Sequence, residues 1–154
     1  MLSLLEHSLA CVHQFSAASW FGALVYRTFF VDPKALRLFG RGSDYERFSL
    51  HLTDGMRGVA LTALVACGLS GAALAGLRSF SHSTPWLVLM VLKVGLWVMA
   101  SALFAYVSWV FWPRRVFAVE QEYAAFRRRS AVLSLIMIAL AGLGILLGQV
   151  SRTV

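Results

Sequence analysis

Long apolar stretches alternate with short polar segments along the whole chain. The apolar stretches cover residues 4–31, 49–77, 86–112 and 131–150. A transmembrane helix needs about 20 consecutive, mostly apolar residues, and each stretch reaches that length. Because the four stretches use most of the 154 residues, no soluble domain remains. The pattern therefore predicts one all-α domain over residues 1–154, an integral membrane four-helix bundle.

The connections between the stretches are short, which favours antiparallel neighbours and an up-down topology. Turn signals at Asp32-Pro33 and at Arg41-Gly42-Ser43-Asp44 bound a short basic first connection over residues 31–48. Small residues recur every four positions in the second stretch, at Gly68, Ala72 and Gly76, and this spacing lets helix backbones approach closely in lipid. No internal repeat is evident in the sequence.

The composition agrees with the bilayer as solvent. Hydrophobic residues make up 59% of the chain and charged residues only 14%, whereas a soluble domain carries about 25% charged residues. No Lys or Arg precedes the first stretch and no clean cleavage site follows it. We therefore expect a retained helix there, and not a signal peptide.

Basic side chains are concentrated at the first and third connections. They are Arg27, Lys34, Arg37, Arg41 and Arg47 at the first, and Arg114, Arg115, Arg127, Arg128 and Arg129 at the third. The second connection has only Arg78 and the C-terminal tail only Arg152. By the positive-inside rule, the first and third connections are cytoplasmic and both termini lie on the outer, periplasmic side. The net charge of +7 is then explained by membrane topology, which indicates a multi-pass protein of the bacterial inner membrane. We therefore expect the protein to contact the lipid bilayer and not to bind nucleic acid.

His13 and Lys93 are polar residues inside apolar stretches. Ionisable residues at membrane depth are costly and usually mark functional sites. With 1.5 Å of rise per residue, His13 lies about 13 Å and Lys93 about 10 Å below the outer surface. The two are expected to face one cofactor-binding pocket, with Trp20 on the same helix face as His13.

Three residues of the first stretch are candidate metal ligands: His7, His13 and Cys11. His7 and Cys11 form an i, i+4 pair suited to a soft metal such as Cu(I). Cys11 and His13 lie about 200° apart around the helix, which hinders a single site for all three. His82 lies near the same outer surface. We expect both Cys11 and Cys67 to be buried thiols, since a free cysteine packs as a small hydrophobe.

Arg47, His51, Asp54 and Arg57 follow one another at helical spacing where the second stretch begins. Asp54 is expected to pair with Arg57 and His51 on the helix surface. The chain has no nucleophile elbow, P-loop, zinc signature or dinucleotide fingerprint, so nothing in the sequence indicates a soluble enzyme site.

His13, followed by Trp20-Phe21-Gly22 and Tyr26, resembles the first helix of two related membrane families. These are the copper resistance protein D family and the HemJ-type protoporphyrinogen oxidase family. Arg47-Phe48-Ser49, Leu92-Lys93 and Arg128-Arg129-Ser130 resemble the openings and interior of the later helices of the D-type domain. In the HemJ-type family, this His and a Lys of a later helix are implicated in haem b binding.

Three functions remain open at this point. The D-type resemblance implies a membrane protein that handles copper at the outer half of the membrane. The HemJ-type resemblance implies a haem b redox protein with His13 as axial ligand. The third alternative is a cofactor-free accessory subunit that docks against a larger membrane or periplasmic partner.

Overall fold

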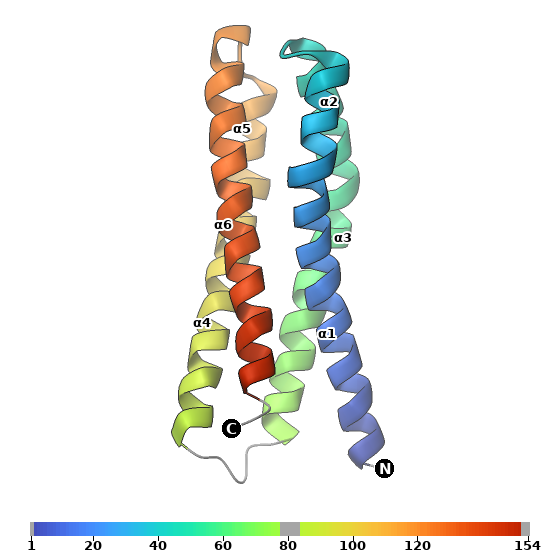
Figure 1. Cartoon of the computed structure of the whole chain (residues 1–154), viewed down its shortest axis with the longest axis vertical. Coiled ribbons are helices and arrows are strands. Elements are labelled where there is room, and N and C mark those ends of the chain that lie inside the picture. Colours follow the sequence, from blue (N-terminus) through green and yellow to red (C-terminus); the bar gives the residue numbers. More distant parts are fainter. Residues whose placement is uncertain (1, 78–83, 152–154) are drawn as a thin grey trace.

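Four long helical segments lie side by side in the computed structural model of the chain (Figure 1). The structure describes residues 2–77 and 84–151, so Arg78, His82 and Arg152 lie outside the described residues. Within those ranges the chain forms helices and short turns and no strand, which confirms the all-α prediction. The first helix begins, and the last helix ends, at the end of the molecule opposite to α2 and α5 (Figure 1).

The first segment is longer than the apolar stretch predicts. α1 (Leu2–Tyr26) continues through a π-helical turn, η1 (Arg27–Val31), into α2 (Asp32–Phe39). Asp32-Pro33 is therefore no turn: Pro33 lies in the first turn of α2, where a proline needs no backbone N–H partner. The helix ends at Gly40, whose φ of 71° is strained for any residue with a Cβ.

The remaining segments complete the bundle. They are α3 (Ser43–Leu77), α4 (Thr84–Tyr106), the π-helical turn η2 (Val107–Phe111), α5 (Trp112–Val116), the 3₁₀ turn η3 (Glu120–Glu122) and α6 (Tyr123–Val150). The predicted first and third connections are thus mostly helical. Helix α1 packs mainly against α3 and α4 against α6, with α1 also contacting α6.

The two halves of the chain share one local structural feature, although no repeat is evident in the sequence. In each half a π-helical turn directly precedes an X-Pro pair, Asp32-Pro33 in the first and Trp112-Pro113 in the second. The wider turn ends with an i→i−5 bond, from the Asp32 N–H to the Arg27 carbonyl and from the Trp112 N–H to the Val107 carbonyl. A π-bulge changes the helix locally where a proline would disrupt regular bonding. The bundle is therefore built as two similar helical hairpins.

Three of the four segments are long and apolar enough to cross a membrane: Ser43–Leu77, Thr84–Val116 and Glu120–Val150. The first segment, predicted as a fourth span, does not reach the same hydropathy. Its apolar stretch contains His7, His13 and Gln14 together with serines. Some of these polar groups face the interior, since Ser16 is buried and His13 is partly buried against α3.

A buried ion triad joins the two hairpins at the α2 and α5 end. The Glu46 side chain of α3 accepts hydrogen bonds from Arg115 Nε at 2.7 Å and from Arg127 Nη1 at 3.0 Å. Glu46 is 4% exposed and Arg115 is 3% exposed. The Arg115 guanidinium also lies over the Trp112 ring, 4.8 Å from its centroid. One carboxylate is thus paired with a cation from α5 and a cation from α6.

We expect Glu46→Gln to lower the free energy of unfolding by about 3–5 kcal/mol, because it leaves two arginines around an uncharged amide. Thermal unfolding of the detergent-solubilised protein measures the change. Asp44→Asn is the matched control, since Asp44 is an exposed carboxylate in the first turn of the same helix. Equal stability of both variants would contradict the structural role of the triad.

Candidate functional site

His13 lies between α1 and α3, in the half of the bundle away from α2 and α5. Its Nδ1 lies 2.8 Å from the Cys67 carbonyl oxygen. The ring packs on Gly71, where an added Cβ would lie 3.0 Å from His13 Cε1. The helix spacing here is therefore set by a glycine that leaves room for an imidazole.

The Cys67 thiol and the Ser70 hydroxyl also lie next to the imidazole. Cys67 Sγ is 3.7 Å and Ser70 Oγ 3.4 Å from His13 Nδ1. The buried Ser70 hydroxyl also donates to backbone carbonyls of its own helix, which fixes its position. We call His13, Cys67 and Ser70 the His13 cluster. It combines nitrogen, sulfur and hydroxyl groups from two helices.

Lys93 approaches the same level from α4. Its Nζ lies beside Gly148 of α6, 3.7 Å from the position of an added Cβ. A common pocket of His13 and Lys93 stays a prediction. Sequence reasoning did not place the Cys67 thiol beside His13, whereas the packing of α1 against α3 does.

Trp20, which was predicted to line the same pocket as His13, lies in the hydrophobic core of the bundle. It is 6% exposed and packs in a core cluster with Leu64, Ala100, Phe104 and Met137. A different indole packs on α3: Trp97 of α4 lies against Gly68 and donates to the Leu64 carbonyl at 3.2 Å.

The structure does not bring His7, Cys11 and His13 together. His7 is exposed and its Nδ1 bonds the Ser3 carbonyl of its own helix. Cys11 is exposed, which corrects the prediction that both cysteines are buried. Within residues 2–77 and 84–151, no group of three His, Cys, Asp or Glu side chains is placed to hold a metal ion. The two potential metal ligands that lie close together are the His13 imidazole and the Cys67 thiol.

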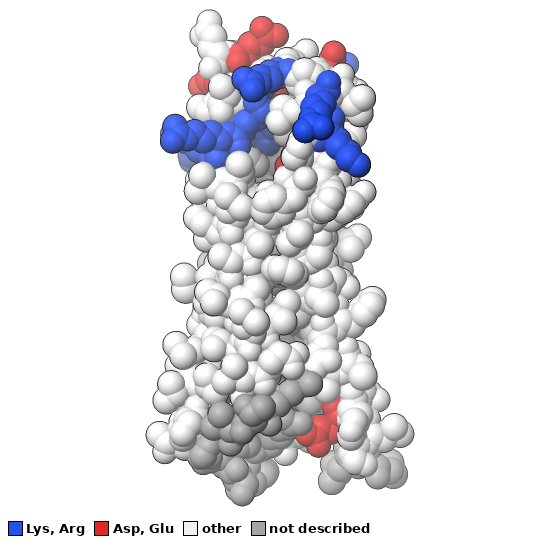
Figure 2. Space-filling view, viewed as in Figure 1, with Lys and Arg blue, Asp and Glu red and all other residues white. Residues whose placement is uncertain are grey.

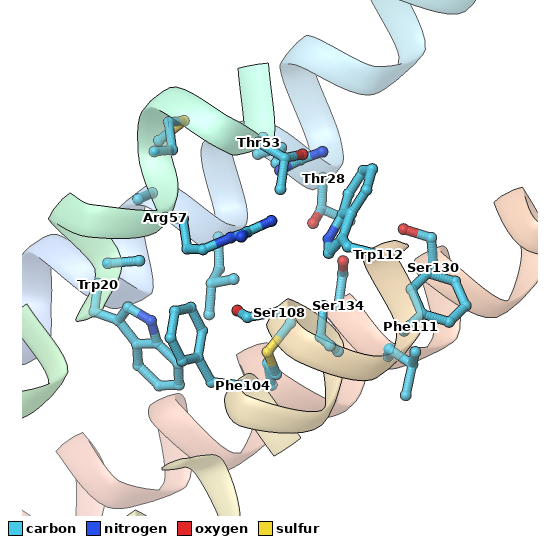
Figure 3. A pocket seen from close by; sticks show the side chains of 18 residues that line it. Trp20, Thr28, Thr53, Arg57, Phe104, Ser108, Phe111, Trp112, Ser130 and Ser134 are labelled. Atoms are coloured by element: carbon cyan, nitrogen blue, oxygen red, sulfur yellow. The ribbon is translucent and has the colours of Figure 1, made fainter. Parts of the chain in front are cut away.

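A cavity lies between the four segments toward the α2 and α5 end (Figure 3). Its volume is about 90 Å³. Polar and aromatic side chains from every segment line it: Trp20, Arg27 and Thr28 from the first, Thr53 and Arg57 from α3, Phe104, Ser108, Phe111 and Trp112 from the third, and Ser130 and Ser134 from α6. We call it the arginine cavity. Sequence reasoning placed Arg57 on the helix surface, whereas its side chain points into this cavity (Figure 3).

Of the two arginines that line the cavity, Arg27 has a carboxylate partner among the described residues and Arg57 has none. Arg27 lies 3.8 Å from the Asp32 carboxylate and donates to Ser49 Oγ at 3.4 Å. Burial raises the pKa of Asp32 above its ordinary value, although Arg27 and Arg115 oppose that shift. The expected ion pair between Asp54 and Arg57 is not formed among the described residues, and Arg57 Nε is buried without a hydrogen-bond partner.

Comparisons with known proteins give no identity: no protein-family model, no curated protein and no solved structure matches the chain.

We expect Gly68→Ala to lower the free energy of unfolding by about 1–3 kcal/mol, because the added methyl would overlap the Trp97 ring and force it to move. Tryptophan emission should also shift to longer wavelength as the Trp97 ring becomes more exposed. Gly58→Ala in the same helix is the control. An added Cβ meets nothing within 4 Å there, so stability should hold or rise. Indistinguishable unfolding curves for the two variants would refute the Trp97 contact.

Proposed function

We propose that the protein is a multi-pass protein of the bacterial inner membrane, with all four segments crossing the bilayer. Charged side chains gather at the α2 and α5 end on the face in Figure 2, above a broad uncharged band. Such a band is what lipid tails require. The basic end faces the cytoplasm, as the positive-inside rule states, and both termini lie in the periplasm.

The first segment spans despite its polar residues because several of them turn toward protein. Ser16 is buried, and His13 is bonded to the backbone of α3. Polar groups inside a membrane are tolerated where they face the bundle interior and find partners. The first segment is thus the polar inner wall of the proposed site, while the other three supply most of the apolar surface.

We further propose that the protein handles copper at the His13 cluster, as its resemblance to the copper resistance D family implies. One observation carries this proposal: an imidazole nitrogen and a thiol from different helices lie 3.7 Å apart. Imidazole and thiolate together form a soft donor set that suits Cu(I). The pair lies in the half of the membrane that faces the periplasm, so copper would enter from the outer side.

The separation of the two donors is compatible with one bound ion once the imidazole proton moves from Nδ1, where it bonds the Cys67 carbonyl, to Nε2, because only an unprotonated nitrogen binds a metal. Metal–nitrogen and metal–sulfur bonds of about 2.0 and 2.3 Å, taken from zinc sites, give a nitrogen–metal–sulfur angle of about 120° at this separation. The unit of Cu(I), one thiolate and one neutral imidazole has no net charge. It therefore avoids the large desolvation cost of a free cation at membrane depth.

A haem b protein is the second candidate, and one contact favours it. The bond between Nδ1 and the Cys67 carbonyl would leave Nε2 to face an iron, the usual arrangement of a ligating histidine. However, the arginine cavity and the neighbouring cavity beside Arg47 and His51 are lined by neither His13 nor Lys93. A haem on His13 would need space that these two cavities do not provide.

Copper binding is tested by titrating the reduced, detergent-purified protein with Cu(I) against a chromophoric chelator. We expect about one tightly bound Cu(I) per chain, since a thiolate–imidazole pair can hold a single ion. This binding should be lost in His13→Ala and in Cys67→Ala. Cys11→Ala is the matched control and should bind like the wild type, because Cys11 is exposed and outside the His13 cluster. Full binding by Cys67→Ala would rule out the proposed pair.

An absorption spectrum of the same sample, oxidised and then reduced with dithionite, separates the alternatives. A Soret band that disappears in His13→Ala would replace copper with haem b. A colourless protein that binds no copper would favour the accessory subunit.

The topology is tested with reporter fusions in a Gram-negative host. Alkaline phosphatase at the C-terminus should be active, because that enzyme folds only in the periplasm, whereas a fusion between α2 and α3 at Gly42 should be inactive. Green fluorescent protein at the same two points should give the opposite result. An inactive phosphatase at the C-terminus together with a fluorescent C-terminal fusion would invert the proposed orientation.

A further inference from the structure

The arginine cavity lies at the opposite level of the bundle from the His13 cluster and has a different chemistry. Two of its lining residues are charged, Arg27 and Arg57, and none of its lining residues is acidic. A guanidinium stays protonated in proteins, so both positive charges persist at any physiological pH. Buried cations are costly without an opposite charge nearby, and no carboxylate lines this cavity between membrane helices.

The nearby carboxylates offset only part of the positive charge around the cavity. Glu46 accepts from Arg115 and Arg127, which are two cations for one anion. Asp32 lies beside Arg27 at 3.8 Å, longer than a hydrogen bond. Asp54 lies with Arg57 along the neighbouring cavity, where Arg47 and His51 add further basic groups. The cluster around the arginine cavity therefore keeps an excess of positive charge.

Arg57 carries one of the few buried polar atoms that lack a hydrogen-bond partner among the described residues, its Nε. Its side chain reaches from α3 into the cavity toward the segments of the other hairpin (Figure 3). The described residues give its buried Nε no hydrogen-bond acceptor. Buried polar groups are almost always satisfied by protein, water or ligand, so this guanidinium N–H is available to donate to a molecule in the cavity.

Hydroxyl groups and aromatic rings complete the surroundings. Ser108 and Ser134 come from opposite helices of the second hairpin and lie across the cavity from Arg57 (Figure 3). Trp20, Phe104 and Trp112 form apolar walls. Hydroxyls donate to an anion without adding charge. The volume of about 90 Å³ corresponds to about three water molecules, which is room for one small polyatomic ion.

We propose that the arginine cavity binds a small oxyanion, a phosphate or carboxylate group, with the Arg57 guanidinium as its principal contact and the Ser108 and Ser134 hydroxyls as secondary donors. A planar guanidinium fork matches the geometry of both groups. The anion balances the charge excess at this end of the bundle. This site is independent of the proposed copper site, because the two share no residue.

The experiment uses the full-length protein in detergent, with chloride as the background anion at constant ionic strength, because chloride carries neither a phosphate nor a carboxylate group. Inorganic phosphate is titrated while tryptophan fluorescence is recorded, since Trp20 and Trp112 line the cavity. A second arm titrates short-chain phosphatidic acid below its micelle concentration. We expect a saturable change with at least one of the two probes. Phosphate alone would identify a free anion as the ligand, and the lipid alone would identify a headgroup.

Variants connect the response to the cavity. Arg57→Gln should raise the dissociation constant about tenfold or more, because a charge-assisted hydrogen bond is lost. Ser108→Ala and Ser134→Ala keep the charge and should each weaken binding less. Arg129→Gln is the control, since it removes an exposed arginine of α6 that does not line the cavity. Arg57→Lys keeps the charge without the fork and should bind with intermediate affinity, which provides a test if the glutamine variant fails to fold.

Two results would overturn the proposal. One is the absence of any saturable response in the wild-type protein to either probe. The other is an equal loss of affinity in Arg57→Gln and Arg129→Gln, which would assign the effect to general surface charge. Neither result bears on copper binding at the His13 cluster.

Discussion

Glu46 is the residue through which one hairpin is tied to the other. Its carboxylate is buried at the end of the bundle where the basic connections gather, and it is bonded to Arg115 and Arg127 of the second hairpin. Inside a low-dielectric interior such a carboxylate is stable only while its cations stay in place. The triad therefore fixes how the two hairpins meet at this end, while the core cluster around Trp20 and Phe104 packs them together farther along. Because one anion faces two cations there, the same arrangement leaves positive charge over for the neighbouring cavity.

The two hairpins also share a local construction. Each has a π-helical turn followed by a proline, and some residues of each turn, such as Arg27 and Ser108, line the arginine cavity. π-bulges inside α-helices occur frequently at functional sites, because the extra residue re-aims the side chains around it. The polar cavity between the hairpins therefore depends on the π-helical turns of the backbone as well as on the identity of the lining residues. At the other level the helices stay regular, and Gly71 makes room for the imidazole of His13.

Much of this architecture could be predicted from the sequence, and the failures have physical causes. Apolar length gave four helical segments, and His13 and Lys93 stood out because ionisable groups are rare at membrane depth. The ends of the helices were harder to predict from the sequence. Asp32-Pro33 resembles a turn signal, yet it lies inside a continuous helical segment. Cys67 and Arg57 were misjudged because membrane helices are apolar all around, so their sequences do not indicate which face turns inward. Only the packing of α1 against α3 places the thiol beside the imidazole.

The central claim is that a nitrogen from α1 and a sulfur from α3 hold one copper ion between them. X-ray absorption spectroscopy of the Cu(I)-loaded protein tests it most directly, because it reports the atoms bound to the metal. The account predicts a first shell with one sulfur at about 2.3 Å and an imidazole nitrogen at about 2.0 Å, with the sulfur lost in Cys67→Ser. A first shell of nitrogen and oxygen alone, unchanged in that variant, would contradict it.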